Sequence, residues 1–411
     1  MKKKKSKPKK PKSLLEKILI IATILGGIAA IGYFVDKAFF PPAPKKVVED
    51  INELKKKVGE LSEYLDGLPQ TKNPELKRLF EKGYSLYKDE KYPEAIDTFK
   101  ACIELKTKDS ERGALLILIG NAYYTLGKLE EAESHYQESL LIGRRIKDKQ
   151  GEAAALGNIG LIYQDRGDLN QALKYHEKAL EIHKEIDYTQ GEASDLGNIG
   201  LIYQDKGYLD QALKYHQDAL KIDQEIGFRE GEANALGNIG NVYYLKGDLD
   251  QALKYLEEAL KIHKEIGFRA GEAKDLGNIG NVYQDKGDLD TALKYHQAAF
   301  KIDKEIGFTG DEVSDLGNIG LIYRAKGDLD QALRCFKEVL AMERELARKW
   351  GEATALLNIG VVYEDKGYLD QALKYYNEAL KIFEEIGMPE QIRLAKRNIE
   401  RISQQMKNPK K

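Results

Sequence analysis

The sequence predicts an all-α solenoid, in which one pair of helices is repeated along the chain. A 40-residue motif recurs, and its Asn-Ile-Gly core begins at Asn158, Asn198, Asn238, Asn278, Asn318 and Asn358. Within each copy the apolar residues follow helical spacing, and no proline lies between Pro93 and Pro389. A fixed period of this size is typical of arrays in which each unit stacks on its neighbours.

The composition fits a folded array with a distinct amino terminus. Of 411 residues, 42% are hydrophobic, and the formal net charge is −2. This average hides a basic tail at residues 1–12, which has eight lysines and no acidic residue, so the rest of the chain carries −10. Cys102 and Cys335 lie six repeats apart, too far for a disulfide within one molecule. We expect both cysteines to be packing residues.

An apolar segment follows the basic tail. Residues 18–35 contain no charge, and a helix of this length spans about 27 Å, close to the ~30 Å hydrocarbon core of a bilayer. We therefore expect residues 13–36 to form a transmembrane helix. Two alternatives stay open. One is a signal peptide cleaved near Ala29, and the other, for the lysine run alone, is a nuclear or nucleic-acid-binding signal.

The charges around this segment predict its orientation in a membrane. Lysines are concentrated before it, whereas only Lys37, Lys45 and Lys46 are near its other end. The positive-inside rule then keeps the amino terminus in the cytoplasm and puts the repeats outside it. The sequence therefore predicts a single-pass membrane protein with an extracytoplasmic repeat domain.

A short heptad pattern separates the apolar segment from the repeats. Residues 37–46 read as a proline-rich linker, and residues 47–68 as a coiled coil. Ile51, Val58 and Leu65 occupy a positions and leucine most d positions, which favours two parallel strands. We expect a parallel homodimer. The alternative is a lone amphipathic helix packed on the first repeat.

Residues 74–390 are expected to form eight helix pairs. The units begin near residues 74, 111, 151, 191, 231, 271, 311 and 351. In the third unit, Leu156, Ile159 and Tyr163 mark the packed face of a first helix, Gly167 ends it, and Asp168 caps the second helix. Left-handed glycines are expected to end second helices at Gly227, Gly267, Gly307 and Gly387.

The third unit resembles the tetratricopeptide repeat. The residues that carry the resemblance are Leu156, Ile159, Gly160, Tyr163, Gly167, Ala172 and Ala179. The unit exceeds the usual length of about 34 residues, which is similar to the subclass of kinesin light chains and Pins-type G-protein regulators. The resemblance implies a right-handed superhelical solenoid. It also implies a concave groove that holds peptides through asparagines of the first helices.

The carboxyl terminus carries a predicted capping helix. Pro389 suits its first turn, and residues 391–406 have one apolar and one basic face, before a tail at 407–411. Such a helix covers the last layer of a solenoid. The seventh unit differs most from the others, with Ala347 in place of the glycine stop. Trp350, the only tryptophan, is expected to fill the joint that follows.

No catalytic or metal-binding motif accompanies the repeats. The sequence lacks His-Glu-x-x-His, Gly-x-Ser-x-Gly and phosphate-loop patterns. His176, His216 and His296 share one position, but copies in neighbouring units would lie roughly 10 Å apart, whereas metal ligands lie at about 2 Å. We therefore expect core histidines, no enzyme activity, no cofactor and no nucleic-acid partner.

The residues expected to bind a partner lie opposite the packed face of each first helix. At about 100° per residue, this face carries positions 154, 158, 161 and 165 in the third unit. The predicted peptide-binding residues are Asn158, Asn198, Asn238, Asn278, Asn318, Asn358, Asn241, Asn281, Asp205 and Asp285. An amide side chain offers both a donor and an acceptor, so an asparagine ladder can pair with peptide bonds. The alternative is that the asparagines bond neighbouring helices.

Together these features predict a membrane-anchored scaffold or adaptor that binds an extended segment of a partner protein. The alternative function is an assembly or chaperone-type factor for a membrane protein complex. A stable complex with one partner favours the adaptor, whereas contact with unassembled subunits alone favours the assembly factor.

Overall fold

The computed structural model describes residues 73–105, 107–307 and 309–407, and every regular element in these ranges is an α-helix. The predicted all-α class is confirmed. The basic tail, the predicted transmembrane helix 13–36, the linker and the coiled coil 47–68 lie outside the described residues. Within the described ranges, no helix is both long and apolar enough to cross a bilayer.

The chain divides into two compact parts at the boundary between Leu118 and Ile119, within α5. In the first compact part, α3 (Pro74–Lys88) and α4 (Tyr92–Glu104) pack as a hairpin. The Asn73 side chain caps α3, because its Oδ1 accepts the N–H groups of Glu75 and Leu76 at 3.0 and 3.3 Å. Such a cap satisfies N–H groups that have no partner within the helix.

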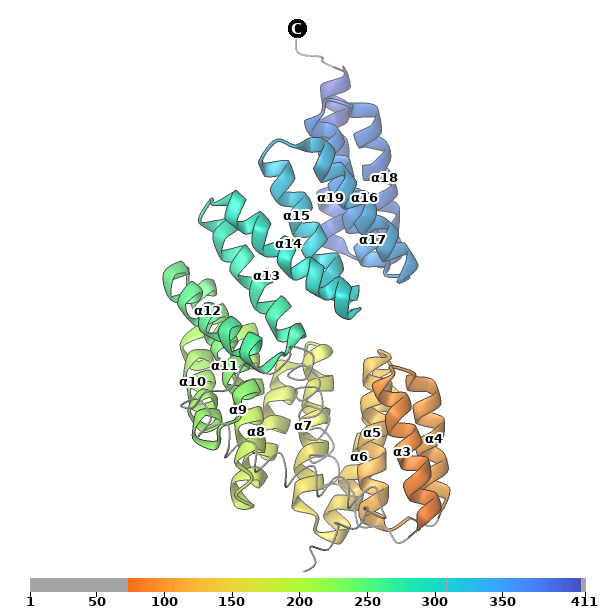
Figure 1. Cartoon of the computed structure of the whole chain (residues 1–411). Coiled ribbons are helices and arrows are strands. Elements are labelled where there is room, and N and C mark those ends of the chain that lie inside the picture. The colour runs from red at the N-terminus through yellow and green to blue at the C-terminus, as the bar shows by residue number, and fades with distance from the viewer. Residues whose placement is uncertain (1–72, 106, 308, 408–411) are drawn as a thin grey trace, which may run out of the picture. The chain divides into compact units, whose positions relative to one another are not determined.

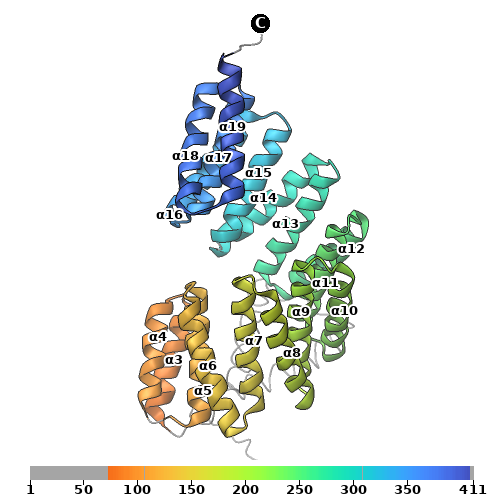
Figure 2. The same cartoon turned by 180° about the vertical axis from the view of Figure 1, so that it is seen from behind.

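The second compact part begins within α5 (Asp109–Thr125) and is a run of helix hairpins (Figures 1 and 2). From α6 onward each helix packs on the next one along the chain. The bounds are α6 (Leu129–Ile146), α7 (Lys149–Asp165), α8 (Leu169–Glu185), α9 (Thr189–Asp205), α10 (Leu209–Ile226), α11 (Arg229–Leu245), α12 (Leu249–Ile266), α13 (Arg269–Asp285), α14 (Leu289–Ile306), α15 (Thr309–Ala325), α16 (Leu329–Glu345), α17 (Lys349–Asp365), α18 (Leu369–Glu385) and α19 (Pro389–Lys407).

Odd-numbered helices from α5 to α17 are the first helices of their units, and even-numbered helices are the second ones. First helices of neighbouring units also touch directly, α9 with α11, α11 with α13 and α13 with α15. The first helices from α9 to α15 therefore form one continuous layer of the array. The final helix, α19, packs on α18 and covers the end of the last unit.

A glycine and an aspartate form the turn within a typical unit. In the third unit Gly167 has a φ of +76°, and the Asp168 N–H donates to the Tyr163 carbonyl at 2.9 Å. The Asp168 side chain then accepts the Gln171 N–H at 3.1 Å and caps α8, as the sequence predicts. Two adjacent residues thus end one helix and begin the next.

The turn between units also uses the left-handed conformation, but not always glycine. Gly227, Gly267, Gly307 and Gly387 have φ values from +69° to +75°, which confirms the predicted stops. Ala347 occupies the same position after α16 with a φ of +53°. The seventh unit therefore keeps the turn of the other units although it lacks the glycine.

Each pair of helices crosses where a glycine meets a large side chain. A Cβ added to Gly160 would lie 2.7 Å from Nε2 of His176, which is fully buried. The same contact recurs in the other seven pairs, as Gly83–Phe99, Gly120–Tyr136, Gly200–His216, Gly240–Leu256, Gly280–His296, Gly320–Phe336 and Gly360–Tyr376. The glycine lets the two backbones approach around one large buried residue.

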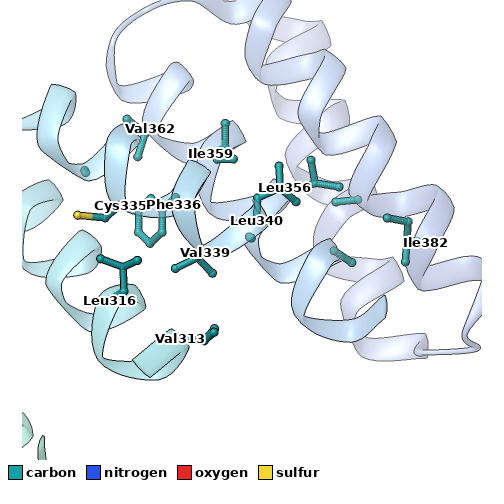
Figure 3. Packing of buried hydrophobic residues seen from close by; sticks show 14 of the residues in the cluster. Val313, Leu316, Cys335, Phe336, Val339, Leu340, Leu356, Ile359, Val362 and Ile382 are labelled. Atoms are coloured by element: carbon teal, nitrogen blue, oxygen red, sulfur yellow. The ribbon is translucent and has the colours of Figure 1, made fainter. Parts of the chain in front are cut away.

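The core between the seventh and eighth units is apolar and continuous (Figure 3). Phe336, Val339 and Leu340 of α16 meet Leu356 and Ile359 of α17. This packing buries residues from four successive helices, because Leu316 of α15 and Ile382 of α18 join the same cluster.

Trp350 is not part of this core, and its predicted role as a joint filler is wrong. Its side chain is 54% exposed. It lies in the first turn of α17 and faces outward, whereas the next residue, Gly351, faces α16 and contacts the Glu343 side chain. The joint is therefore closed by Glu343 and not by the indole ring.

Charged pairs lie at two edges of the array, and those at one edge link each unit to the next. Near the turn within a unit, Lys246 bonds Asp210 and Lys286 bonds Asp250, both at 2.6 Å. At the other end of the helices Arg229 of α11 bonds Glu265 of α12 at 2.9 Å, and this pair joins the two helices of one unit. Exposed pairs contribute about 0–1 kcal/mol each, so they set the register of the stack more than its stability.

We expect Ala347→Gly to stabilise the protein, because a non-glycine residue in the left-handed region costs about 1–2 kcal/mol. Greater freedom of glycine in the unfolded chain offsets part of this gain, which leaves about 0.5–1 kcal/mol. The matched control is Gly227→Ala at the equivalent position, which should destabilise. Urea unfolding of the full chain, followed by circular dichroism, measures both. A lower midpoint for Ala347→Gly would contradict the account of this turn.

Candidate functional site

In the larger of the two compact parts of the chain, the first helices of the repeats present one face away from the second helices. In α7, Ala154 and Asp165 are exposed and Asn158 is half-buried on this face, whereas Leu156 and Ile159 on the opposite side are fully buried. We call the surface formed by the equivalent positions of α7, α9, α11, α13, α15 and α17 the first-helix face. It is the face that helical spacing in the sequence predicts.

One predicted asparagine from each of these six helices lies half-buried on the first-helix face. They are Asn158, Asn198, Asn238, Asn278, Asn318 and Asn358. Asn158 donates through Nδ2 to Oδ1 of Asn121 in α5, the preceding first helix, at 3.4 Å. The other five make no side-chain hydrogen bond to any described residue.

The accessibility of these amides differs at one position. Nδ2 of Asn278 is buried and lacks a partner among the described residues. The amide groups of Asn198, Asn238, Asn318 and Asn358 reach solvent. A half-buried amide without a protein partner keeps both its donor and its acceptor for another molecule. The alternative that asparagines bond neighbouring helices therefore holds for Asn158 alone.

Asn241 and Asn281 follow the crossing glycine and are also half-buried on this face. They share their helix position with Asn121, whose Oδ1 accepts the Tyr136 hydroxyl at 2.8 Å. At the same position α7 and α9 carry Leu161 and Leu201. The face is thus polar at α11 and α13 and more apolar on α7 and α9.

The two predicted aspartates lie at the rim of the face and bond the preceding first helix. Nε2 of Gln164 donates to Asp205 at 3.3 Å, and the Tyr244 hydroxyl donates to Asp285 at 2.7 Å. Burial, together with the Asp285 carboxylate, raises the pKa of Tyr244 to about 12. Both carboxylates therefore join neighbouring units, a contact that sequence analysis missed. Their part in peptide binding stays a prediction.

Buried histidine–aspartate pairs lie beneath the face, and the sequence analysis did not predict them. Nδ1 of His183 lies 2.7 Å from Asp195, and Nδ1 of His263 lies 2.7 Å from Asp275. Each pair joins the end of a second helix to the next first helix. Burial raises the pKa of Asp275, against the opposite effect of its bond to His263. The sequence feature that could have revealed these pairs is an aspartate on the apolar side of a helix, because a buried carboxylate is costly unless it has a partner.

Asp223 occupies the histidine position of this pair without its partner. It is 5% exposed and packs against Gly231 in the first turn of α11. The residue equivalent to Asp195 and Asp275 is here Ala235. Burial, with a smaller effect of Glu232, raises the pKa of Asp223 to about 6.

The histidines predicted to lie in the core, His176, His216 and His296, are fully buried. Burial lowers the pKa of His216 to about 4, so this ring is neutral at physiological pH. Among the described residues, no group of three or more His, Cys, Asp and Glu side chains could hold a metal ion. The first-helix face therefore offers hydrogen-bonding groups and apolar side chains to a partner.

A family model described as Tetratricopeptide repeat matches residues 111–185, 192–265, 272–345 and 311–385. A search of curated proteins finds no match. A Rap protein complexed with Competence and Sporulation Factor is similar in structure, at 15% identity, over 82% of this chain and 99% of that chain, with a TM-score of 0.53.

Two further solved structures are similar to this chain. The Rap conjugation gene regulator of plasmid pLS20, in complex with the Phr* peptide, has 18% identity over 76% of this chain and 96% of that chain, with a TM-score of 0.52. A signal transduction ATPase with a tetratricopeptide repeat sensor, from Pyrococcus horikoshii, has 19% identity over 83% of this chain and 51% of that chain, with a TM-score of 0.61. At these identities the similarity is one of fold.

We expect Asp223→Asn to stabilise the protein at neutral pH but not in acid. The folded protein holds the Asp223 proton with a pKa of about 6, against about 3.9 in an unfolded chain. The stability from this protonation is complete below the unfolded pKa and is lost as the pH rises through 6. The variant should therefore gain about 1–3 kcal/mol above pH ~6.5 and nothing near pH ~4.

Melting curves of the full chain over this pH range measure the difference between the variant and the parent. The control is Asp218→Asn, which removes the same charge from an exposed site on α10. A gain that is independent of pH, or equal in the control, would contradict the burial of an unpaired carboxyl group at Asp223.

Proposed function

Because the chain belongs to the tetratricopeptide repeat family, we propose that it is a membrane-tethered adaptor that binds an extended segment of a partner protein. The binding surface is the first-helix face of α7 to α17. The observation that carries this proposal is the row of five half-buried asparagines whose amides have no partner among the described residues. Amides that have no protein partner can exchange water for the N–H and C=O groups of a peptide backbone.

The spacing of the asparagines suits an extended chain. Packed helices lie roughly 8–10 Å apart, and an extended chain advances about 3.3 Å per residue. One asparagine per unit can therefore meet about every third residue of a ligand. Contacts to backbone groups give affinity without reading the ligand sequence, and exposed neighbours such as Asn234 and Lys274 supply side-chain preference.

Similar folds offer support for a peptide ligand. The Rap conjugation gene regulator is in complex with the Phr* peptide, and another Rap protein is complexed with Competence and Sporulation Factor. A right-handed superhelical path of this chain would turn the first-helix face into a concave groove. We propose, by similarity of fold to these complexes, that this chain also holds a peptide in such a groove.

The amino-terminal sequence supplies the membrane part of the proposal. Residues 18–35 are long and apolar enough to anchor the chain, and the preceding lysines favour a cytoplasmic amino terminus. The repeats then face the extracytoplasmic side, with two chains joined through residues 47–68. A paired array doubles the number of binding faces held at one point of the membrane.

We expect Asn238→Ala with Asn278→Ala to weaken peptide binding by about 1–3 kcal/mol, at 0.5–1.5 kcal/mol for each lost hydrogen bond. The melting temperature should stay unchanged, because neither amide bonds another described side chain. The probe is the tightest peptide selected from a random phage-displayed library against the full chain. Fluorescence anisotropy measures its affinity.

The matched control for this pair is Asn377→Ala, an exposed asparagine on α18 and away from the first-helix face. It should leave peptide affinity unchanged. If the double variant melts at a lower temperature while its folded fraction binds normally, the asparagines are structural and the proposal fails.

The membrane arrangement can be tested with one cysteine. In intact expressing cells, Ile51→Cys should form a disulfide-linked dimer, because an a position faces its copy in a parallel coil and the compartment outside the cytoplasm is oxidising. A membrane-impermeant reductant added to the cells should break it. Glu53→Cys, on the outer side of the heptad, should form less dimer. A monomer, or a dimer that resists the reductant, would contradict the arrangement.

A further inference from the structure

Two places on the first-helix face are open where the others are filled. They lie beside Gly197 of α9 and Gly317 of α15, where an added Cβ would meet nothing within 4 Å. At the equivalent Gly237 and Gly277 an added Cβ would contact Asp275 at 3.4 Å and Asp315 at 3.3 Å. Gly157 has a similar contact with Asp195 at 3.7 Å. The face is thus uneven although its sequence is repetitive.

The cause is one residue in the following first helix. The aspartates that fill the other places are Asp195, Asp275 and Asp315, whereas Ala235 and Ala355 occupy the same position after Gly197 and Gly317. A methyl group is too short to reach the glycine. Both alanines are buried, at 5% and 1% exposure, so neither projects a side chain beside the glycine as the aspartates do.

Both open places are lined by apolar side chains. One helical turn after Gly197 and Gly317 stand Leu201, which is half-buried, and Leu321, which is 37% exposed. Residues four apart lie on the same side of a helix, so each leucine flanks its open place. The leucine beside each place favours an apolar occupant. Asn198 and Asn318, which follow the two glycines, remain available for the backbone of the same ligand.

The stretch between the two places has the opposite character. On α11 and α13 the residues after the crossing glycine are Asn241 and Asn281, where α9 and α15 carry Leu201 and Leu321. Beneath this stretch lie the buried Asp275 and Asp315, so apolar side chains gain nothing there. The face therefore reads apolar, polar, polar, apolar from α9 to α15.

We propose that the places beside Gly197 and Gly317 receive two apolar side chains of one extended polypeptide, with polar residues between them. This inference rests on the proposed function and specifies its ligand. The places are three units apart, about 24–30 Å at 8–10 Å per helix. An extended chain covers that distance in about seven to nine residues. The ligand class is thus a segment with two large aliphatic residues at this separation.

The test uses synthetic fluorescein-labelled peptides of serine, asparagine and glycine that carry two leucines at separations from about three to twelve residues. Anisotropy measures their affinity for the full chain in detergent. Affinity should peak at about seven to nine residues and exceed that of a one-leucine peptide about tenfold. A flat dependence on separation, or no binding up to about 1 mM, would overturn the inference.

A substitution that fills one of the two open places tests the assignment further. Gly197→Leu adds a side chain into open space, so it should fold and should abolish the preference for one separation. The control is Gly157→Leu, at the same position of α7, which should keep the preference. Equal loss in both variants means general obstruction of the face and overturns the inference. Melting temperatures identify any variant that is unfolded.

Failure of this inference can be separated from failure of the proposed function. Asn238→Ala with Asn278→Ala should weaken every two-leucine peptide by a similar factor while the preferred separation is kept. If that variant weakens all peptides but no separation is preferred in the parent, the asparagine ladder stands and the two apolar places are wrong. If the separation is preferred and the asparagine variant has no effect, the apolar places stand alone.

Discussion

The contact of a glycine with a large buried side chain, repeated in every helix pair, sets the distance between the two helices of a unit. Because Gly160 has no side chain, His176 can lie directly against its helix, and the flanking Leu156 and Ile159 then meet the second helix at full packing density. The partner varies among histidine, leucine, phenylalanine and tyrosine, but the glycine does not. The angle of each hairpin, and hence the alignment of the first helices, depends on this contact.

The same alignment decides which residues form the first-helix face. With the crossing glycine fixed against the second helix, the residue two positions before it always points away from that helix. Asn238 and Asn278 are therefore brought to one surface by a packing constraint and not by any bond of their own. The aspartates at the rim act differently, because Asp205 and Asp285 bond the previous unit and hold neighbouring first helices together.

The fold could be predicted almost completely from the sequence, because a 40-residue period repeats the same helical spacing and the same turn glycine, with an aspartate cap at α8, α12, α14 and α16. The first-helix face followed from that spacing. Three features could not be predicted. The left-handed Ala347 breaks a residue preference that the neighbouring packing overrides, and the exposure of Trp350 depends on which residue of a first turn faces α16. The pair of His263 with Asp275 joins two helices across a turn, so no periodicity within one helix reveals it.

The charged pairs between units have a consequence for how such a chain can change its length. Lys246 bonds Asp210 and Lys286 bonds Asp250 with the same geometry, and the main helix contacts of the described residues lie within a unit or between adjacent units. If one 40-residue unit were deleted in frame, Lys286 would meet Asp210 as Lys246 does now, and α19 would still close the end. Duplication would be accommodated in the same way. The array can therefore be lengthened or shortened by recombination between its own repeats in steps of one unit that keep these charged pairs, except where the new junction would bury Asp223 against Asp275.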